Sequence, residues 1–394
     1  MKANKEKYVV VDDNPNVLKS LLGSLSGRKS GLSFHDPFSP DPDVIECAKM
    51  VSNKLSENAA TGVVLDLRLD ECVPKKGKPA RYLAQTLAQA LRTDMANGKC
   101  LDVPIVLWSI SQKFKSKFSR DILSHDLFDA CIVKDPDDCE LTRQATLLSA
   151  LSNGYRIVRK CLESKKPDLE ALLVPPDGIE LDRGIWEEFQ SVSTKVAHRV
   201  SMHIRSNMLD RNGPLVSTEI LSARLGIEIE QLDARSTLSK VLKNFEYSGP
   251  FSEISKRWWW SSVLDWWKSE VDNRSPLYYT SSERVRLLRE KFGGKSKFVE
   301  LNFPKSKEFP SRELSLRFST VCLVTKRPLD PVDGFLVARG HSYPWQDEEY
   351  VCEDVVIRPS KYARMRNNEV VVSSLEKERV DRLKAQSKAA RGKK

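Results

Sequence analysis

Five polar side chains in the first third of the chain follow closely behind short apolar runs. They are Asp12, Asp13, Asp66, Ser109 and Lys134. Three carboxylates held together repel one another unless a divalent cation lies among them. A charged carboxylate can act as a nucleophile, and a hydroxyl and an ammonium can stabilise negative charge on a transferred group. If the fold brings the five together, they form a cation-dependent group-transfer site.

The elements that would position these side chains alternate between strand and helix. Amphipathic stretches at 17–25, 44–51 and 83–91 separate the apolar runs, and a helix at 141–151 follows them. This alternation predicts βαβ units with five strands and five helices. In such folds ligands bind at the edge where the carboxyl ends of the parallel strands meet. The strands are predicted at 8–11, 31–34, 63–65, 105–107 and 131–133.

Four motifs in these elements resemble those of the receiver domains of response regulators in two-component signalling. The resemblance covers roughly residues 5–160 and implies a flavodoxin-like fold with strand order 2-1-3-4-5. The motifs are VVVDDNP at 9–15, VVLDLRLDE at 63–71, PIVLWS at 104–109 and DACIVKDP at 129–136.

The resemblance also implies a role for each side chain of the set. Asp66 would accept a phosphoryl group from a histidine kinase, a phosphotransfer protein or a small phosphodonor. Mg²⁺ would be held directly by Asp13 and Asp66, directly or through water by Asp12, and by the backbone carbonyl of Arg68. The Ser109 hydroxyl and the Lys134 ammonium would contact the oxygens of the transferred group.

The chain departs from the family pattern at several positions. Cys131 stands at the switch position, where the family usually carries an aromatic residue, and Asp135 separates Lys134 from Pro136. We therefore expect the switch to differ while the transfer chemistry is retained. A basic loop at 74–79 could gate access or recognise a kinase, although a solvated turn is the simpler interpretation. Taken singly, each motif also has an ordinary explanation as a capping turn, a solvated serine or a surface lysine.

Length and composition predict ordinary globular domains. The 394 residues are 40% hydrophobic, which is enough for two or three cores, and no stretch is long and apolar enough to span a membrane. The amino terminus runs from charged residues directly into the first strand, so no secretory signal is expected. Eight cysteines without a paired framework favour free thiols in a cytoplasmic setting.

Beyond the receiver-like segment the chain is predicted to be mainly helical and then of smaller α+β character. Of the net charge of +10, residues after 150 carry +9, from 43 basic and 34 acidic groups. Such a basic half favours acidic partners, nucleic acid among them. The predicted divisions are a receiver domain at 1–162, a linker at 163–178, a helical output region at 179–275, an α+β output region at 276–375 and a basic tail at 376–394.

Residues 215–245 have the spacing of a helix-turn-helix, with Gly226 at the turn. Against DNA reading, the segment expected to enter the groove begins with Glu228, Glu230 and Asp233, which carry the wrong charge to face phosphates. A helical packing or docking unit is the alternative. The basic tail allows nonspecific phosphate contact or a frayed, solvated helix.

Five tryptophans fall within ten residues, and Trp259, Trp266 and Trp267 share one helical face with Val263. A buried core face is the simplest interpretation. An exposed face would instead be a partner surface or a stacking platform for single strands. The residues of that alternative surface are Trp258, Trp259, Trp266 and Trp267.

Isolated histidines and cysteines in the second half match no metal motif. His198 and His203 are expected at the surface or as helix caps. Cys322, His341 and Cys352 surround two predicted strands, at 316–324 and 335–338, without the spacing of a zinc site.

The sequence thus predicts a response-regulator-like signalling protein that accepts a phosphoryl group on Asp66 and acts through protein partners. A phosphorylation-controlled DNA-binding regulator is one alternative. The other is a receiver that is not phosphorylated, fused to an unrecognised effector of bacterial stress or phage defence, which rests on family analogy alone. No enzyme signature accompanies the receiver motifs.

Overall fold

The chain forms two compact units in the computed structural model, and each is described here by itself. Unit 1 contains residues 1–174, 187–206 and 248–255, and unit 2 contains residues 175–186, 207–247 and 256–394. Two stretches of the predicted helical output region therefore belong to unit 1. The structure describes residues 6–391 except 17, 58–59, 72–78, 110–125, 165–166, 177–180, 192–195, 233, 294–297, 302–313 and 341.

Unit 1 is built on a parallel sheet in the order β2-β1-β3-β4-β5, which confirms the predicted α/β class and strand order. Continuous runs of β-branched and aliphatic residues form the central strands because both of their faces are covered. The basic loop at 74–79 lies, apart from Pro79, outside the described residues. The strands are β1 (Glu6–Val11), β2 (Leu32–Phe34), β3 (Gly62–Asp66), β4 (Ile105–Ser109) and β5 (Ala130–Val133).

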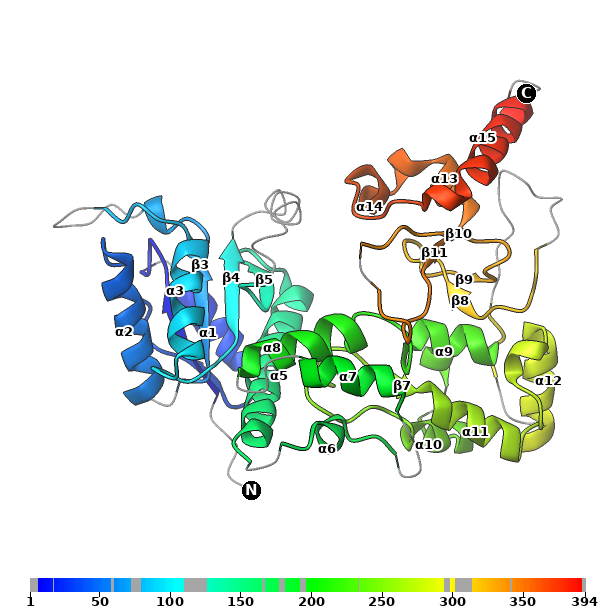
Figure 1. Ribbon diagram of the computed structural model, residues 1–394, viewed down its shortest axis with the longest axis horizontal. Coiled ribbons are helices and arrows are strands. Elements are labelled where there is room, and N and C mark those ends of the chain that lie inside the picture. The colour runs from blue at the N-terminus through cyan, green and yellow to red at the C-terminus, as the bar shows by residue number, and fades with distance from the viewer. Residues whose placement is uncertain are drawn as a thin grey trace. The chain divides into compact units, whose positions relative to one another are not determined.

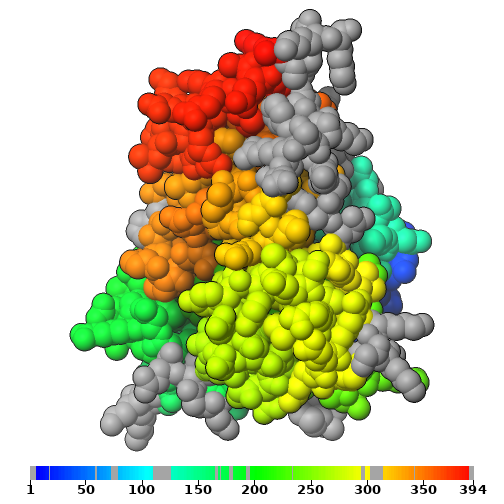
Figure 2. Space-filling model, turned by 90° about the vertical axis from the view of Figure 1, so that its right-hand side faces the viewer, coloured from blue at the N-terminus to red at the C-terminus, as the bar shows by residue number. Residues whose placement is uncertain are grey.

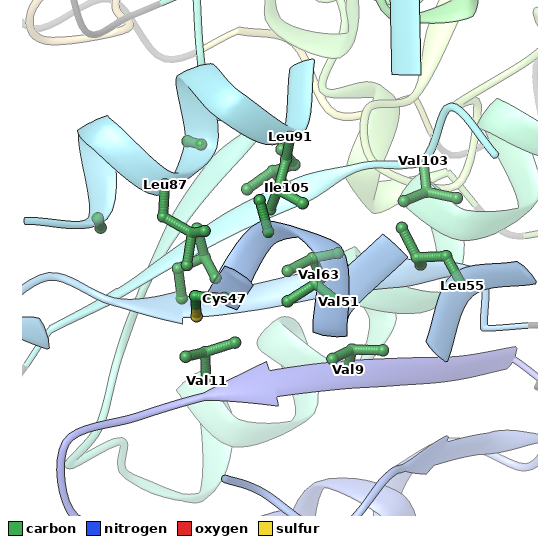
Figure 3. Close-up of a cluster of buried hydrophobic side chains, with 14 of the residues drawn as sticks. Val9, Val11, Cys47, Val51, Leu55, Val63, Leu87, Leu91, Val103 and Ile105 are labelled. Atoms are coloured by element: carbon green, nitrogen blue, oxygen red, sulfur yellow. The ribbon is translucent and has the colours of Figure 1, made fainter. Parts of the chain in front are cut away.

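Helices cover both faces of this sheet (Figure 1). Apolar side chains from α2 and α3 pack on Val9, Val63 and Ile105 of the strands, as Figure 3 shows, and this cluster is closed to solvent. On the other face α1 packs beside α5. A predicted helix between β4 and β5 falls on 110–125, outside the described residues. The helices are α1 (Lys19–Arg28), α2 (Val44–Glu57), α3 (Ala84–Ala96) and α5 (Asp138–Leu162), with a 3₁₀ turn at Leu69–Glu71.

Two later segments of the chain pack on α5 within unit 1. Helix α8 (Ala197–His203) lies against α5, and Phe251 from the segment 248–255 contacts Gly154 and Tyr155. A Cβ atom at Gly154 would lie 2.1 Å from the Phe251 ring, so a glycine is required there. Lys29 and Glu253 form an ion pair of 3.1 Å at the edge of this contact. The chain also forms α6 (Leu169–Leu173), α7 (Arg183–Ser191) and a π-helical turn at Ile204–Leu209.

Within unit 2, a small antiparallel sheet and a group of helices share one apolar core. Strand β6 (Leu215–Ser217) pairs with β7 (Arg257–Trp259), and residues 245–247 pair with the other edge of β7. The side chains of Ile220, Leu238 and Trp267 are buried together in this core. The helices are α9 (Thr218–Leu225), α10 (Thr237–Lys243), α11 (Trp260–Glu270) and α12 (Ser281–Phe292), with 3₁₀ turns at Ile229–Gln231 and Pro276–Tyr278.

The rest of unit 2 consists of short strands followed by helices. Its residues are coloured orange to red in Figure 2, above the yellow-green residues of the first part. The predicted strands at 316–324 and 335–338 are shorter than expected and do not form one hairpin with each other. Strand β8 (Thr320–Val321) pairs with β9 (Pro328–Leu329), because the chain turns at Lys326 with φ of 59°, and β10 (Phe335–Leu336) pairs with β11 (Tyr350–Val351). The helices are α13 (Glu353–Ile357), α14 (Ala363–Arg366) and α15 (Lys377–Arg391), with 3₁₀ turns at Pro359–Lys361 and Ser374–Glu376.

The described part of the basic tail is helical. Leu383 and Ser387 of α15 are buried, and α15 packs on α13. The remaining α15 side chains are mostly exposed, in keeping with their charge. None of the described helices is long and apolar enough to cross a membrane.

Candidate phosphoacceptor site

The three predicted acids meet at the carboxyl edge of the unit 1 sheet. Asp12 follows the last residue of β1, Asp13 comes next, and Asp66 ends β3, which is the neighbour of β1. One carboxylate oxygen from each lies within 4.8 Å of the other two. Asp12 is 1% exposed and Asp66 is 6% exposed, whereas Asp13 is half-buried. The cluster is thus open to solvent on the Asp13 side.

Lys134 joins this cluster from the end of β5, which is separated from β3 by β4. Its Nζ lies 2.7 Å from Asp12 Oδ2 and 2.9 Å from Asp66 Oδ1. The backbone N–H of Lys134 donates to the carbonyl of Ser109 over 2.9 Å, which holds the ends of β4 and β5 side by side. The Ser109 side chain is buried at this edge. The parallel register therefore brings all five predicted side chains to one end of the sheet.

The electrostatics of the cluster are dominated by burial and crowding. Burial raises the pKa of Asp66 to about 6, and Asp12 and Asp13 add to this rise while Lys134 opposes it. Burial alone would lower the pKa of Lys134, but its contacts with Asp12 and Asp66 outweigh that effect and raise it. One ammonium thus only partly compensates three carboxylates.

These residues fit a hard divalent cation. Mg²⁺ prefers oxygen ligands and is typically held by one or two carboxylates. Keeping Asp66 ionised costs free energy, and the Lys134 ammonium alone does not remove this cost. A bound metal cation would lower it further. Asp12, Asp13 and Asp66 are therefore the residues that could hold the metal.

The structure places the other two predicted site residues less centrally. The carbonyl of Arg68 accepts a hydrogen bond from the N–H of Glu71 over 3.2 Å, and the Arg68 side chain is exposed and pairs with Asp70. Cys131 is half-buried in β5 and packs against the apolar cluster beneath the sheet. Neither side chain takes part in the acid cluster.

The tryptophan-rich segment is mainly core. Trp258, Trp259 and Trp267 are at most 4% exposed, so the alternative of an exposed partner surface does not hold for them. Trp266 is half-buried and stacks on Phe292 with 6.2 Å between ring centroids. Trp259 belongs to β7 instead of the helix, because the strand pairing with β6 continues to that residue.

A buried polar network at the opposite, amino edge of the sheet was not predicted from the sequence. The side chain of Asp129 is fully buried and contacts Arg92 Nη2 at 2.7 Å, Arg205 Nη1 at 3.1 Å and the Tyr155 hydroxyl at 2.8 Å. Burial alone would raise the pKa of Asp129, but Arg92, His198 and Arg205 outweigh it and lower that pKa. The network fastens residues 197–206 to the sheet of unit 1.

The expectation that His198 and His203 lie at the surface is wrong. Both are buried, and the His198 ring contacts the Tyr155 hydroxyl at 2.8 Å and the carbonyl of Asp126 at 2.6 Å. The cause is packing, because α8 presents these side chains to α5 and to Phe189 instead of to solvent. The spacing of apolar residues does not predict that a histidine is buried when it makes polar contacts inside the protein.

These histidines should make unit 1 sensitive to acid. Burial lowers the pKa of His198 and of His203 below 6.5, the value of the unfolded chain. The unfolded state therefore binds more protons below this pH, and the free energy of unfolding falls as the pH drops through about 6.5. We expect a slope of up to about 1.4 kcal/mol per pH unit for each histidine, measured by urea unfolding between pH 7.5 and 5. A His203→Gln variant should show a shallower slope, and an unchanged slope would contradict the assignment.

Comparisons with known proteins add little beyond this geometry. No family model matches the chain, and no curated protein matches it. Among solved structures, adenylate cyclase from Rhodopirellula baltica is 11% identical with a TM-score of 0.28, covering 41% of this chain and 99% of its own. The phosphorylated cyanobacterial phytochrome response regulator RcpA is 19% identical with a TM-score of 0.24, covering 36% and 88%. NtrX from Brucella abortus, in complex with ATP, is 13% identical with a TM-score of 0.29, covering 62% and 56%. Because these TM-scores are low, the fold assignment depends on the strand order of the sheet.

Proposed function

We propose that unit 1 is a receiver domain that accepts a phosphoryl group on Asp66. The observation that carries this proposal is the convergence of Asp12, Asp13 and Asp66 with the Lys134 ammonium at one sheet edge. A cluster of acids alone would be ordinary. Here the Asp66 carboxylate lies 2.9 Å from an ammonium and beside two further acids. Transfer of a phosphoryl group to a carboxylate requires such a nucleophile together with groups that compensate its negative charge.

Each side chain has a distinct part in this proposal. Asp66 supplies the attacking carboxylate oxygen, and Lys134 pairs with an oxygen of the transferred group as charge develops on it. Ser109, at the end of the adjacent strand, donates its hydroxyl to another oxygen. Bound Mg²⁺ would neutralise negative charge on the acids and on the phosphoryl group. A histidine kinase, a phosphotransfer protein or a small phosphodonor would supply that group.

The phosphorylation state of unit 1 would reach unit 2 through a segment of the chain that packs on the receiver. Residues 248–255 pack on α5 in unit 1. In the chain they connect residues 245–247 to β7, and these two segments pair with each other in unit 2. A change in the packing of α5 would therefore act on both flanking strands. The phosphoryl group stabilises whichever of two packing arrangements makes the better contacts with it. Protein partners that bind the two arrangements with different affinity would then respond to phosphorylation.

Labelling with acetyl phosphate tests the proposal. We expect the intact mass of the wild-type protein to increase by one phosphoryl group in the presence of Mg²⁺, and the increment to disappear with a chelator. Asp66→Asn should show no increment, because the amide is not a nucleophile of this kind, whereas Asp70→Asn, which alters a half-buried nearby acid paired with Arg68, should label normally. A wild-type protein that stays unlabelled under conditions that label an authentic receiver would instead support the alternative of an unphosphorylated docking module.

A further inference from the structure

The two helices and three strand segments at the start of unit 2 follow one another in the order of a winged helix-turn-helix. Strand β6 leads into α9, α10 follows, residues 245–247 form a second strand segment, and β7 closes the sheet between the two. Ser217 and Ser236 cap α9 and α10, and Gly226 ends α9 in the left-handed conformation with φ of 78°. Leu221, Leu238 and Leu242 bury the inner faces of the two helices together. In this order α10 is the element that would enter a groove.

The structure answers part of the charge objection raised by the sequence. Glu228 and Glu230 precede α10 and do not lie on it, because a 3₁₀ turn at Ile229–Gln231 intervenes and α10 begins only at Thr237. Asp233 lies outside the described residues. The residues on α10 and at its end that remain exposed are polar or basic, namely Thr237, Lys240, Lys243 and Asn244.

These exposed side chains lie on one helical face, since they recur at intervals of three and four. The surface beside them is hollowed to a volume of about 720 Å³. The charged side chains that line the hollow are Lys240, Lys243, Lys256, Glu230 and Glu246. Glu246 pairs with Lys243 at 2.8 Å, whereas no described carboxylate lies within ion-pair distance of Lys240 or Lys256. The three lysines therefore exceed the two glutamates that line the hollow by one positive charge.

We infer that this α10 surface, formed by Thr237, Lys240, Lys243, Asn244 and Lys256, binds duplex DNA. An α-helix with its side chains is about 10–12 Å in diameter, which matches the width of the major groove, about 12 Å, and α10 spans seven residues. Lys240 and Lys256 contact backbone phosphates, and Thr237 and Asn244 offer a hydroxyl and an amide to base edges. The net charge of +9 beyond residue 150 has the sign that such a partner needs. This inference does not depend on phosphorylation of Asp66.

The inference is tested with the full chain and a fluorescent DNA duplex of mixed sequence, by anisotropy over a series of salt concentrations. We expect the Lys240→Gln, Lys256→Gln double variant to bind roughly tenfold or more weakly at about 0.1 M salt. The slope of log affinity against log salt should become shallower by about two. Glu246→Gln should strengthen binding, because it removes the carboxylate that pairs with Lys243. Thermal unfolding verifies that each variant is folded.

The matched control is Lys384→Gln with Lys388→Gln, two exposed lysines of α15 in the basic tail. Unchanged binding by this variant supports the α10 surface. Binding that falls with the α15 pair and not with the α10 pair would overturn the inference, as would a preference for single-stranded RNA over duplex DNA. Each measurement is repeated with acetyl phosphate and Mg²⁺, and no binding in either state would also overturn it. Asp66→Asn separates the two proposals, since DNA binding by that variant stands even if labelling fails.

Discussion

Replacing Lys134 with alanine is expected to lower the free energy of unfolding of the metal-free protein by about 3 kcal/mol. The side chains of Asp12 and Asp66 are 2% and 7% exposed, and both carboxylates lie within 2.9 Å of the Lys134 Nζ. Without the ammonium, two buried carboxylates face Asp13 with no counter-charge. Urea unfolding with a chelator present measures the loss. Saturating Mg²⁺ should restore part of the stability, because the cation replaces the missing charge.

The loss in Lys134→Ala should also depend on pH. Asp66 titrates near pH 6 in the intact cluster, so its protonation below that value removes part of the repulsion and the loss becomes smaller. Lys29→Ala is the matched control, because Lys29 pairs with Glu253 at 3.1 Å but is 34% exposed, and its removal should cost about 1 kcal/mol or less. Equal losses in the two variants would show that Lys134 has no special relation to the acids.

Labelling of Asp66 by acetyl phosphate should slow roughly 100-fold in Lys134→Ala.

Replacing Asp129 with asparagine is expected to destabilise the protein by about 3 to 5 kcal/mol. The Asp129 carboxylate is fully buried, and it is the partner of Arg92 and Arg205 and accepts a hydrogen bond from the backbone N–H of Ile105 over 2.9 Å. An amide removes the carboxylate that lies 3.1 Å from Arg205, and it leaves Arg92 with only the longer ion pair to Asp102 at 3.5 Å. Urea unfolding at neutral pH measures the effect.

Tyr155→Phe is the control for this second variant. It removes one hydrogen bond to Asp129 and one contact with His198 but leaves both arginine pairs intact, so we expect a loss of about 1 kcal/mol. A loss in Asp129→Asn no larger than that of Tyr155→Phe would contradict the ionic account of the network. Because Arg205 belongs to the segment 187–206, proteolysis of that segment should also become faster in Asp129→Asn.

The unit 1 sheet could be predicted because its strands are nearly continuous apolar runs. Burial on both faces requires such runs at Val63–Leu65 and Ile105–Leu107, and the acids mark the points where the runs end. Parallel topology then fixes which strand ends are neighbours, so Asp66 and Lys134 could be placed at one edge without coordinates. The half-buried position of Cys131 does not follow from the pattern, because β5 is the last strand of the sheet and three of its four residues are half-buried.

The second half could be predicted only in part because its elements are short and depend on tertiary packing. Strands of two or three residues, such as β8, leave no periodicity to detect. The start of α10 was placed too early because the 3₁₀ turn at Ile229–Gln231 carries helix-like spacing. Long-range polar networks are also invisible to local patterns, since Asp129 and Arg205 are 76 residues apart.

The measurement that tests the central claim most directly is a crystal structure of the protein with Mg²⁺ and beryllofluoride, a stable mimic of a phosphoryl group on a carboxylate. The account predicts beryllofluoride bonded to Asp66, with a fluorine in contact with the Lys134 Nζ and a cation about 2.1 Å from oxygens of Asp13 and Asp66. Beryllofluoride on a different residue, or a saturated crystal in which Asp12, Asp13 and Asp66 bind neither species, would contradict it.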